Sequence, residues 1–252
     1  RSEVYGSTLI FYEGIKVRQG QAKTIKYLPK GLCVLSHYPF YDGYRTFLEQ
    51  LYRIVNSTLS LPLERHIASF YYSVRVPRPF QTVVYSLGHA HIRFSRPPSF
   101  GLPLADFSLA PLFCCLSVEN VVKLYEHALG EGKVILYADS YKNITAVAEA
   151  LRVLLFPFEW QGLFIPILPS NLSYSLRAIV PFIIGLHRTF LEEVRVDREV
   201  MLVDLDRNDI QMPVYSLDVP PVQPLPKPLR EALENTLTPL VPAATSSSSS
   251  SS

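Results

Sequence analysis

The second half of the chain alternates short, nearly continuous apolar runs with longer amphipathic stretches, and this alternation constrains the fold more than any other feature. The apolar runs predict strands at 112–116, 133–138, 163–168, 181–186 and 200–205. Strands this apolar are typical of a parallel sheet covered by helices on both faces. The intervening stretches are long enough for crossover helices. We therefore expect an open, mostly parallel α/β sheet over residues 111–212.

The two longest intervening stretches carry recognisable helix starts. Ser117 precedes one of them, and either Asp139 or Ser140 precedes the other. Serine and aspartate are preferred N-caps because their side-chain oxygens accept a hydrogen bond from a free backbone N–H of the first turn. Pro157 follows the second stretch and predicts its end.

The first half of the chain has a different pattern. Short β-rich runs occur at 8–12 and 32–36, and an amphipathic helix is predicted at 43–55. A second helix is expected after Pro62, because proline is tolerated in a first turn. A hairpin is expected at 81–94. This order of elements predicts a separate α+β lobe.

Charge changes where the pattern changes. The first 110 residues contain 13 basic and 6 acidic side chains, whereas the remainder contains 11 basic and 16 acidic ones. Such an asymmetry favours two lobes that dock or steer a partner electrostatically. We expect a first lobe over 1–95, a linker over 96–110, a second lobe over 111–212 and a tail over 213–252.

The tail has the composition of a segment without a core of its own. Residues 213–242 include eight prolines, and seven serines follow at 246–252. An amphipathic patch at 229–237 predicts a short docking helix. The serine run is consistent with either a flexible linker or an artificial addition.

Composition excludes several classes of function. The net charge of +2 is too small to indicate a nucleic-acid partner. The three cysteines, Cys33, Cys114 and Cys115, encode neither a disulfide framework nor a zinc cage and favour a reducing, cytoplasmic setting. The most apolar stretch, 153–168, is too short and interrupted to predict a transmembrane segment. Because the chain starts at Arg1, we expect a piece of a longer polypeptide.

Motifs for chemistry are weak. The sequence GEGK at 130–133 lacks the spacing of a phosphate loop, and no dinucleotide fingerprint opens a predicted helix. His89 and His91 supply too few ligands for zinc. The carboxylates at 204–209 resemble a cation cluster, but ordinary turn chemistry accounts for them. We expect no metal, no cofactor and no catalytic residue; a hydrolase or metalloenzyme is the least supported alternative.

Several stretches, in this order, resemble the DENN domain family. They lie at 36–41 (SHYPFY), 47–53 (FLEQLYR), 116–121 (LSVENV), 147–151 (VAEAL), 156–161 (FPFEWQ), 165–169 (IPILP), 181–187 (PFIIGLH) and 203–206 (VDLD).

The resemblance implies a longin-like α+β first lobe followed by the open α/β lobe. It also implies a guanine nucleotide exchange factor that releases GDP from a Rab-family small GTPase, without covalent catalysis, by displacing the GTPase's switch regions. The GTPase is then expected across both lobes, with peripheral membrane association through other regions. The tail departs from the helical downstream region of the family, so a non-catalytic scaffold that binds a GTPase or trafficking protein is the alternative.

Interface candidates follow from the rule that open α/β sheets bind ligands beyond the C-terminal ends of their strands. In the second lobe they are Ser117, Glu119, Asn120, Asp139, Ser140, Tyr141, Ser170 and Asn171. In the first lobe they are Tyr38, Phe40 and Tyr41, which precede a helix. Each has a structural alternative: the serines as helix caps, Phe40 and Tyr141 as core, and Glu119 as a charge that favours a helix start.

Overall fold

The computed structural model divides the chain into two compact units, residues 1–107 and 108–252. The residues that it describes are 4–19, 22–57, 61–98, 100–101, 103–215 and 221–240. Over these residues, no helix combines the length and apolar character needed to cross a membrane.

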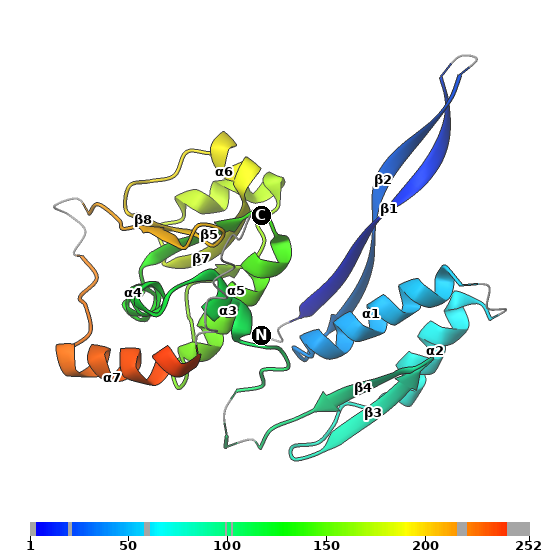
Figure 1. The fold of residues 1–252 in the computed structure, drawn as a ribbon, viewed down its shortest axis with the longest axis horizontal. Helices are drawn as coiled ribbons and strands as arrows, with labels where there is room; N and C mark the ends of the chain where they lie inside the picture. The colour runs from blue at the N-terminus through cyan, green and yellow to red at the C-terminus, as the bar shows by residue number, and fades with distance from the viewer. Residues whose placement is uncertain are drawn as a thin grey trace, which may run out of the picture. The chain divides into compact units, whose positions relative to one another are not determined.

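The described residues of the first unit form two hairpins and two helices (Figure 1). Its elements are β1 (Tyr5–Gln19), β2 (Ala22–Ser36), α1 (Tyr41–Val55), α2 (Leu63–Ser73), β3 (Thr82–Leu87) and β4 (Ala90–Ser95). Both predicted helices and the predicted second hairpin are confirmed. The short strands expected at 8–12 and 32–36 are parts of much longer strands. The longin likeness of this unit stays a prediction.

Aromatic side chains form the core of the first unit. Phe40 and Phe47 are both 2% exposed, and they pack with Phe94 of β4 in one apolar cluster. A Cβ atom on Gly43 would lie only 2.6 Å from the Phe94 ring, so this position of α1 requires glycine. The small residue lets α1 approach the β3–β4 hairpin closely.

Asp106 holds the start of α1. Its carbonyl oxygen accepts a hydrogen bond from the Asp42 N–H at 3.0 Å, and its carboxylate accepts one from the Gly43 N–H at 3.2 Å. Burial raises the pKa of Asp106 to about 6; the Gly43 hydrogen bond opposes this shift and the Asp42 carboxylate adds to it. Residues of the expected linker thus pack as part of the first unit.

The second unit is a five-stranded sheet with the strand order β6-β7-β5-β8-β9. All neighbouring strands are parallel except β8 and β9. The strands are β5 (Lys133–Ala138), β6 (Leu163–Ile165), β7 (Phe182–His187), β8 (Val200–Asp204) and β9 (Asp209–Gln211). The helices are α3 (Ala110–Cys115), α4 (Val118–Leu129), α5 (Tyr141–Leu154), the 3₁₀ helix η1 (Ser170–Arg177), α6 (Arg188–Glu193), α7 (Lys227–Leu237) and the 3₁₀ turn η2 (Thr238–Leu240).

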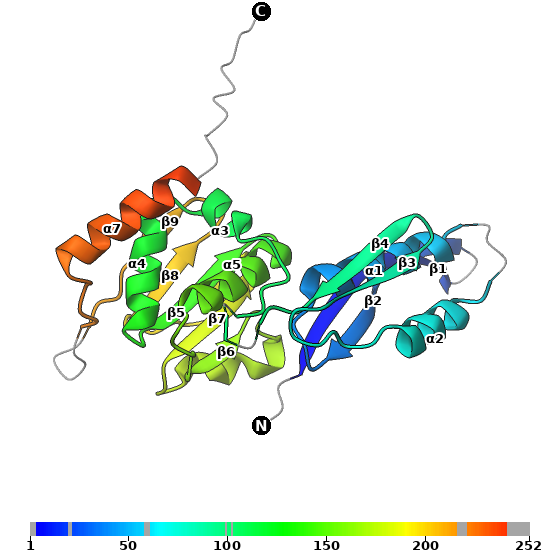
Figure 2. The ribbon, with the colours of Figure 1, turned by 90° about the horizontal axis from the view of Figure 1, so that it is seen from below.

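Helices cover both faces of this sheet, as the apolar strands predicted (Figure 2). α5 packs on β5 and β7, and its Ile144 approaches Gly185 of β7. The other face forms a cluster in which Phe182 and Ile184 pack with Leu176 of η1 and Phe190 of α6. α5 and α6 therefore lie on opposite faces.

Three details of the second unit differ from the sequence prediction. The expected strand at 112–116 is wrong, because Pro111 starts the helix α3 and Leu112 and Leu116 are buried one turn apart. Accordingly, Cys114 is exposed and Cys115 half-buried on a helix. The strand expected at 163–168 ends at Ile165, before a proline. The antiparallel edge strand β9 was not predicted.

The tail contributes the predicted docking helix. α7 packs along α4, as Figure 2 shows. Arg230 of α7 lies 3.5 Å from the Glu126 carboxylate, which also accepts a hydrogen bond from the Leu225 N–H at 3.3 Å. The serine run at 246–252 lies outside the described residues.

The raised pKa of Asp106 predicts a pH dependence. Between the ordinary Asp pKa and about 6, the folded chain binds more protons than the unfolded chain, so this group lowers the free energy of unfolding as pH rises. Asp106→Asn should remove this pH-dependent part of the unfolding free energy, because an amide does not titrate in this range. The amide oxygen can still accept the Gly43 hydrogen bond, so the start of α1 is kept. Urea unfolding of the first unit from pH 4 to 7 measures it; parallel pH profiles of wild type and variant would contradict the assignment.

Candidate partner-binding edge of the central sheet

The topology of the second unit creates a switch point at the C-terminal ends of two neighbouring strands. β5 and β7 are adjacent and parallel, but the chain leaves β5 toward α5 on one face and leaves β7 toward α6 on the other. Open α/β sheets bind ligands at such a reversal. We define the carboxyl edge as the residues that meet there: Ser117, Glu119, Asn120, Asp139, Tyr141, His187, Arg188, Asp204, Asp206 and Asn208.

Arg188 joins three carboxylates from two loops. Its guanidinium makes a bidentate pair with Asp204, with Nη1···Oδ2 at 2.9 Å and Nη2···Oδ1 at 2.7 Å. Nη2 also donates to Asp206 at 2.7 Å, and Nε lies 3.3 Å from Asp139 Oδ1. The planar fork of arginine allows this geometry, which a lysine ammonium cannot reproduce.

Asp204 is the buried member of the network, at 3% exposure. Its Oδ1 also accepts the backbone N–H groups of Asp206 and Arg207, each at 3.1 Å. The Arg188 hydrogen bonds, followed by these backbone donors, lower the pKa of Asp204 in spite of its burial, and the same carboxylates raise the pKa of Arg188. A fully hydrogen-bonded carboxylate thus fixes the turn after β8.

Two further contacts tie the turn after β8 to the end of β5. The Asp139 N–H donates to Asp206 Oδ2 at 2.9 Å, and the Leu205 N–H donates to the Tyr137 carbonyl at 3.0 Å. Arg188 also lies 5.1 Å above the Tyr137 ring. Burial and the nearby Asp204 raise the pKa of Tyr137, so its phenol is neutral at physiological pH.

His187 connects the end of β7 to the loop after β5. Its Nδ1 accepts the Thr189 N–H at 3.4 Å, which assigns the ring proton to Nε2 for donation to the Asp139 carbonyl at 3.1 Å. The Tyr141 ring lies 4.9 Å from the imidazole, centroid to centroid. Tyr141 is nevertheless 47% exposed, so its ring is accessible to solvent at this edge.

Asn208 holds the start of α4. Its Oδ1 accepts the Ser117 N–H at 2.8 Å, and its Oδ1 and carbonyl accept the Asn120 side-chain amide at 2.9 and 2.8 Å. Asn208 has φ +52°, a conformation that asparagine tolerates better than most residues. Ser117 caps α4 by accepting the Asn120 N–H at 3.4 Å, as predicted. The carboxylate of Glu119 lies 2.7 Å from the ammonium group of Lys123, one turn further along α4.

The structure brings together most candidates of the second unit. Ser117, Glu119 and Asn120 belong to the Asn208 side of the edge, and Asp139 and Tyr141 belong to the Arg188 side. Ser140 occupies the N-cap position of α5 without a side-chain cap bond. Ser170 and Asn171 are exposed at the start of η1 and take no part in these hydrogen bonds.

The first-unit candidates lie in the core or against it. Phe40 is buried and makes edge-to-face contacts with Tyr44 and Phe94, so its core alternative holds and its surface is not available to a partner. Tyr38 is half-buried beside Phe40. Tyr41 is half-buried too and stays a candidate.

Sequence reasoning missed His187, Arg188 and Asn208. The edge rule was applied to the segments after the three predicted strands 112–116, 133–138 and 163–168, but not to those after β7 and β8, where the same rule points to all three. The carboxylates at 204–209 were weighed as a cation cluster and as ordinary turn residues, but not as partners of an arginine. No cluster of three or more His, Cys, Asp or Glu side chains suited to a metal occurs among the described residues.

The described residues thus form an α+β unit and an open α/β unit with a hydrogen-bonded carboxyl edge. Residues 27–208 match the family profile described as the DENN (AEX-3) domain. The chain is also similar to the DENN domain and WD repeat-containing protein SCD1 of Arabidopsis thaliana, with 31% identity over 212 residues. The match covers 83% of this chain and 17% of that protein. The chain belongs to the DENN domain family.

Loss of Arg188 should destabilise the second unit. Arg188→Leu leaves Asp204 buried and unpaired, which costs about 3 kcal/mol of unfolding free energy near pH 7. Because pairing lowers the pKa of Asp204, its contribution is present above the ordinary Asp pKa and is lost as pH falls, so wild type and variant should converge in acid.

Chemical denaturation at several pH values measures the Arg188 effect. Arg207→Leu is the matched control, because Arg207 is exposed in the same turn, and it should change stability by less than about 0.5 kcal/mol. Equal losses in the two leucine variants would contradict the assigned role of the network.

Proposed function

We propose that this chain is a guanine nucleotide exchange module that promotes GDP release from a Rab-family GTPase by displacing its switch regions. Membership of the DENN domain family carries the proposal, because the family is a regulatory one associated with small GTPases. The carboxyl edge supplies a candidate contact surface on the second unit.

Exchange of this kind needs preferential binding rather than covalent chemistry. A GTPase holds its nucleotide through its phosphate loop, Mg²⁺ and ordered switch segments. A protein that binds more tightly when those segments are displaced weakens nucleotide binding by the same factor. Tenfold faster release requires only about 1.4 kcal/mol of preferential stabilisation.

The carboxyl edge suits such a role because it is both exposed and fixed. Tyr141 offers an aromatic ring, and the side chains of Asp139 and Glu119 are 71% and 67% exposed. The network beneath them is already ordered, so binding immobilises few additional side chains. The surface is suited to a partner with apolar and basic groups.

A non-catalytic scaffold is the second candidate. The name of the matched relative describes its domains and no exchange activity. A scaffold would use the same surface and bind the relaxed and displaced GTPase equally well, which shifts no equilibrium. The two candidates therefore differ in nucleotide release and not in binding.

Tyr141→Ala tests whether the carboxyl edge, rather than another surface of the second unit, contacts the GTPase. Fluorescent-GDP release is measured across a panel of Rab GTPases with wild type, Tyr141→Ala and Phe158→Ala. Phe158 is a matched control: it is an exposed aromatic residue of the same unit, placed after α5 and before β6, at the opposite end of the sheet. We expect about tenfold slower stimulated release for the Tyr141 variant and no change for the control.

Other results of the panel would argue against the proposal. GTPase binding without faster release by wild type would favour the scaffold. Equal exchange by the Tyr141 and Phe158 variants would remove the carboxyl edge as the contact surface.

A further inference from the structure

The β1–β2 hairpin has an unusual amount of uncovered apolar surface. Each strand is 15 residues long, and the pairing runs in unbroken antiparallel register from Tyr5 opposite Ser36 to Gln19 opposite Ala22. Figure 1 shows the hairpin extending well beyond α1, the helix against which its base packs. A two-stranded ribbon alone is only marginally stable in water, so its far part gains from a partner.

The register assigns the side chains of the hairpin to two faces. On one face, Phe11 packs on Tyr52 of α1, with ring centroids 5.0 Å apart, and Tyr5 contacts Tyr41. Among the described residues of the first unit, no helix packs on the other face. Its large apolar side chains are 59–71% exposed and are Ile10, Tyr12, Ile25, Tyr27 and Leu35.

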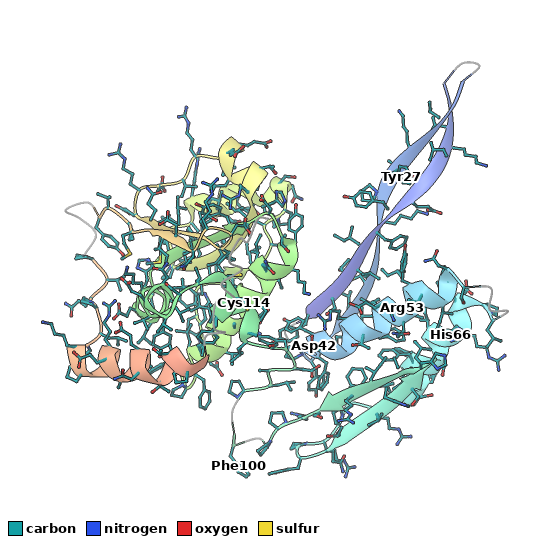
Figure 3. The ribbon with its side chains drawn as sticks, in the orientation of Figure 1. Tyr27, Asp42, Arg53, His66, Phe100 and Cys114 are labelled. Atoms are coloured by element: carbon teal, nitrogen blue, oxygen red, sulfur yellow. The ribbon has the colours of Figure 1, made fainter. Side chains whose placement is uncertain are left out.

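Gly14 leaves room for two large side chains of this open face. Gly14 lies opposite Tyr27, whose ring would be 3.4 Å from a Cβ atom there, and Ile25 would be 3.1 Å away. Figure 3 shows Tyr27 on the part of the hairpin that extends past α1. The result is an exposed row of tyrosine and isoleucine on a ribbon; scattered single apolar residues would need no explanation, but a contiguous patch indicates a binding surface.

The charge of the hairpin indicates the partner. Residues 16–30 contain five Lys or Arg residues and no Asp or Glu. Lys16 is exposed on the open face, opposite Ile25, whereas Lys26 is exposed on the other face, opposite Ile15. A second copy of the chain would bring like charges together at this surface, which disfavours self-association. The complementary partner is therefore negatively charged.

We propose that the open face of the β1–β2 hairpin, defined by Ile10, Tyr12, Ile25, Tyr27, Leu35 and Lys16, binds the surface of an anionic phospholipid bilayer. Tyrosine places its ring at the headgroup level while its hydroxyl stays hydrated. Isoleucine enters the boundary of the acyl chains, and lysines are attracted to the negative lipid headgroups.

A bilayer explains the combination better than an acidic protein would. The apolar and basic groups lie along a thin ribbon that exposes both of its edges, and backbone groups at a membrane interface remain hydrated. The hairpin therefore needs no complementary pocket in its partner. This surface is separate from the carboxyl edge and does not depend on the proposed exchange activity.

Vesicle co-sedimentation of the full chain tests the proposal. The vesicles are phosphatidylcholine alone, or phosphatidylcholine with about one third phosphatidylserine. Wild type should bind only the anionic vesicles, and less at high salt. Lys16→Gln should weaken binding about fivefold, since a basic group near the surface contributes about one kcal/mol.

The apolar part is tested by Tyr12→Ser with Tyr27→Ser, which keeps every charge and should also weaken binding. Tyr71→Ser with Tyr72→Ser is the matched control, because these two tyrosines are exposed on α2 of the same unit, and it should bind like wild type. Circular dichroism and thermal unfolding establish that each variant is folded. GDP exchange in vesicle-free solution should be the same for wild type and both hairpin variants.

Four results would overturn the proposal. The first is no binding of wild type to anionic vesicles at low salt. The second is binding that both hairpin variants retain. The third is dimerisation in sedimentation that the hairpin variants abolish, which would make the face a contact between copies. The fourth is hairpin-dependent capture of an acidic protein without vesicle binding.

Discussion

The carboxyl edge depends on the bidentate pair between Arg188 and the buried carboxylate of Asp204. A carboxylate that is 3% exposed is stable only when its oxygens are paired, and Arg188 together with two backbone N–H groups pairs them. The same guanidinium reaches Asp206 and Asp139, so one side chain sets the positions of the loops after β5 and β8. Exposed groups such as Tyr141 gain their fixed placement from this network.

The open sheet was predictable because the strands of the second unit are almost continuously apolar. A continuous apolar run is typical of a strand that is covered by helices on both faces. The run at 112–116 was misread because a short apolar run has no visible period. Pro111 was the local signal for a helix start there. The weak edge strand β9 has neither length nor apolar character, and it pairs only because β8 offers it a free edge.

Half of the candidate site could be found from the sequence, because it depends on local features. The other half depends on contacts between distant segments and could not. Ser117, Asp139 and Tyr141 follow from strand ends and caps, which are local features. Their partners Asn208, Arg188 and His187 come from distant segments, and only the strand order β7-β5-β8 brings them together. The exposed face of the β1–β2 hairpin was hidden because the sequence predicted only fragments of its strands.

The central claim is that the carboxyl edge contacts the GTPase as one ordered surface. Hydrogen–deuterium exchange of the chain, alone and with a nucleotide-free Rab GTPase, tests this claim directly. The account predicts joint protection of segments 117–120, 139–141 and 187–189 on binding, with little change at 158–162, at the opposite end of the sheet. Protection confined to that opposite end, or none in the three edge segments, would contradict it.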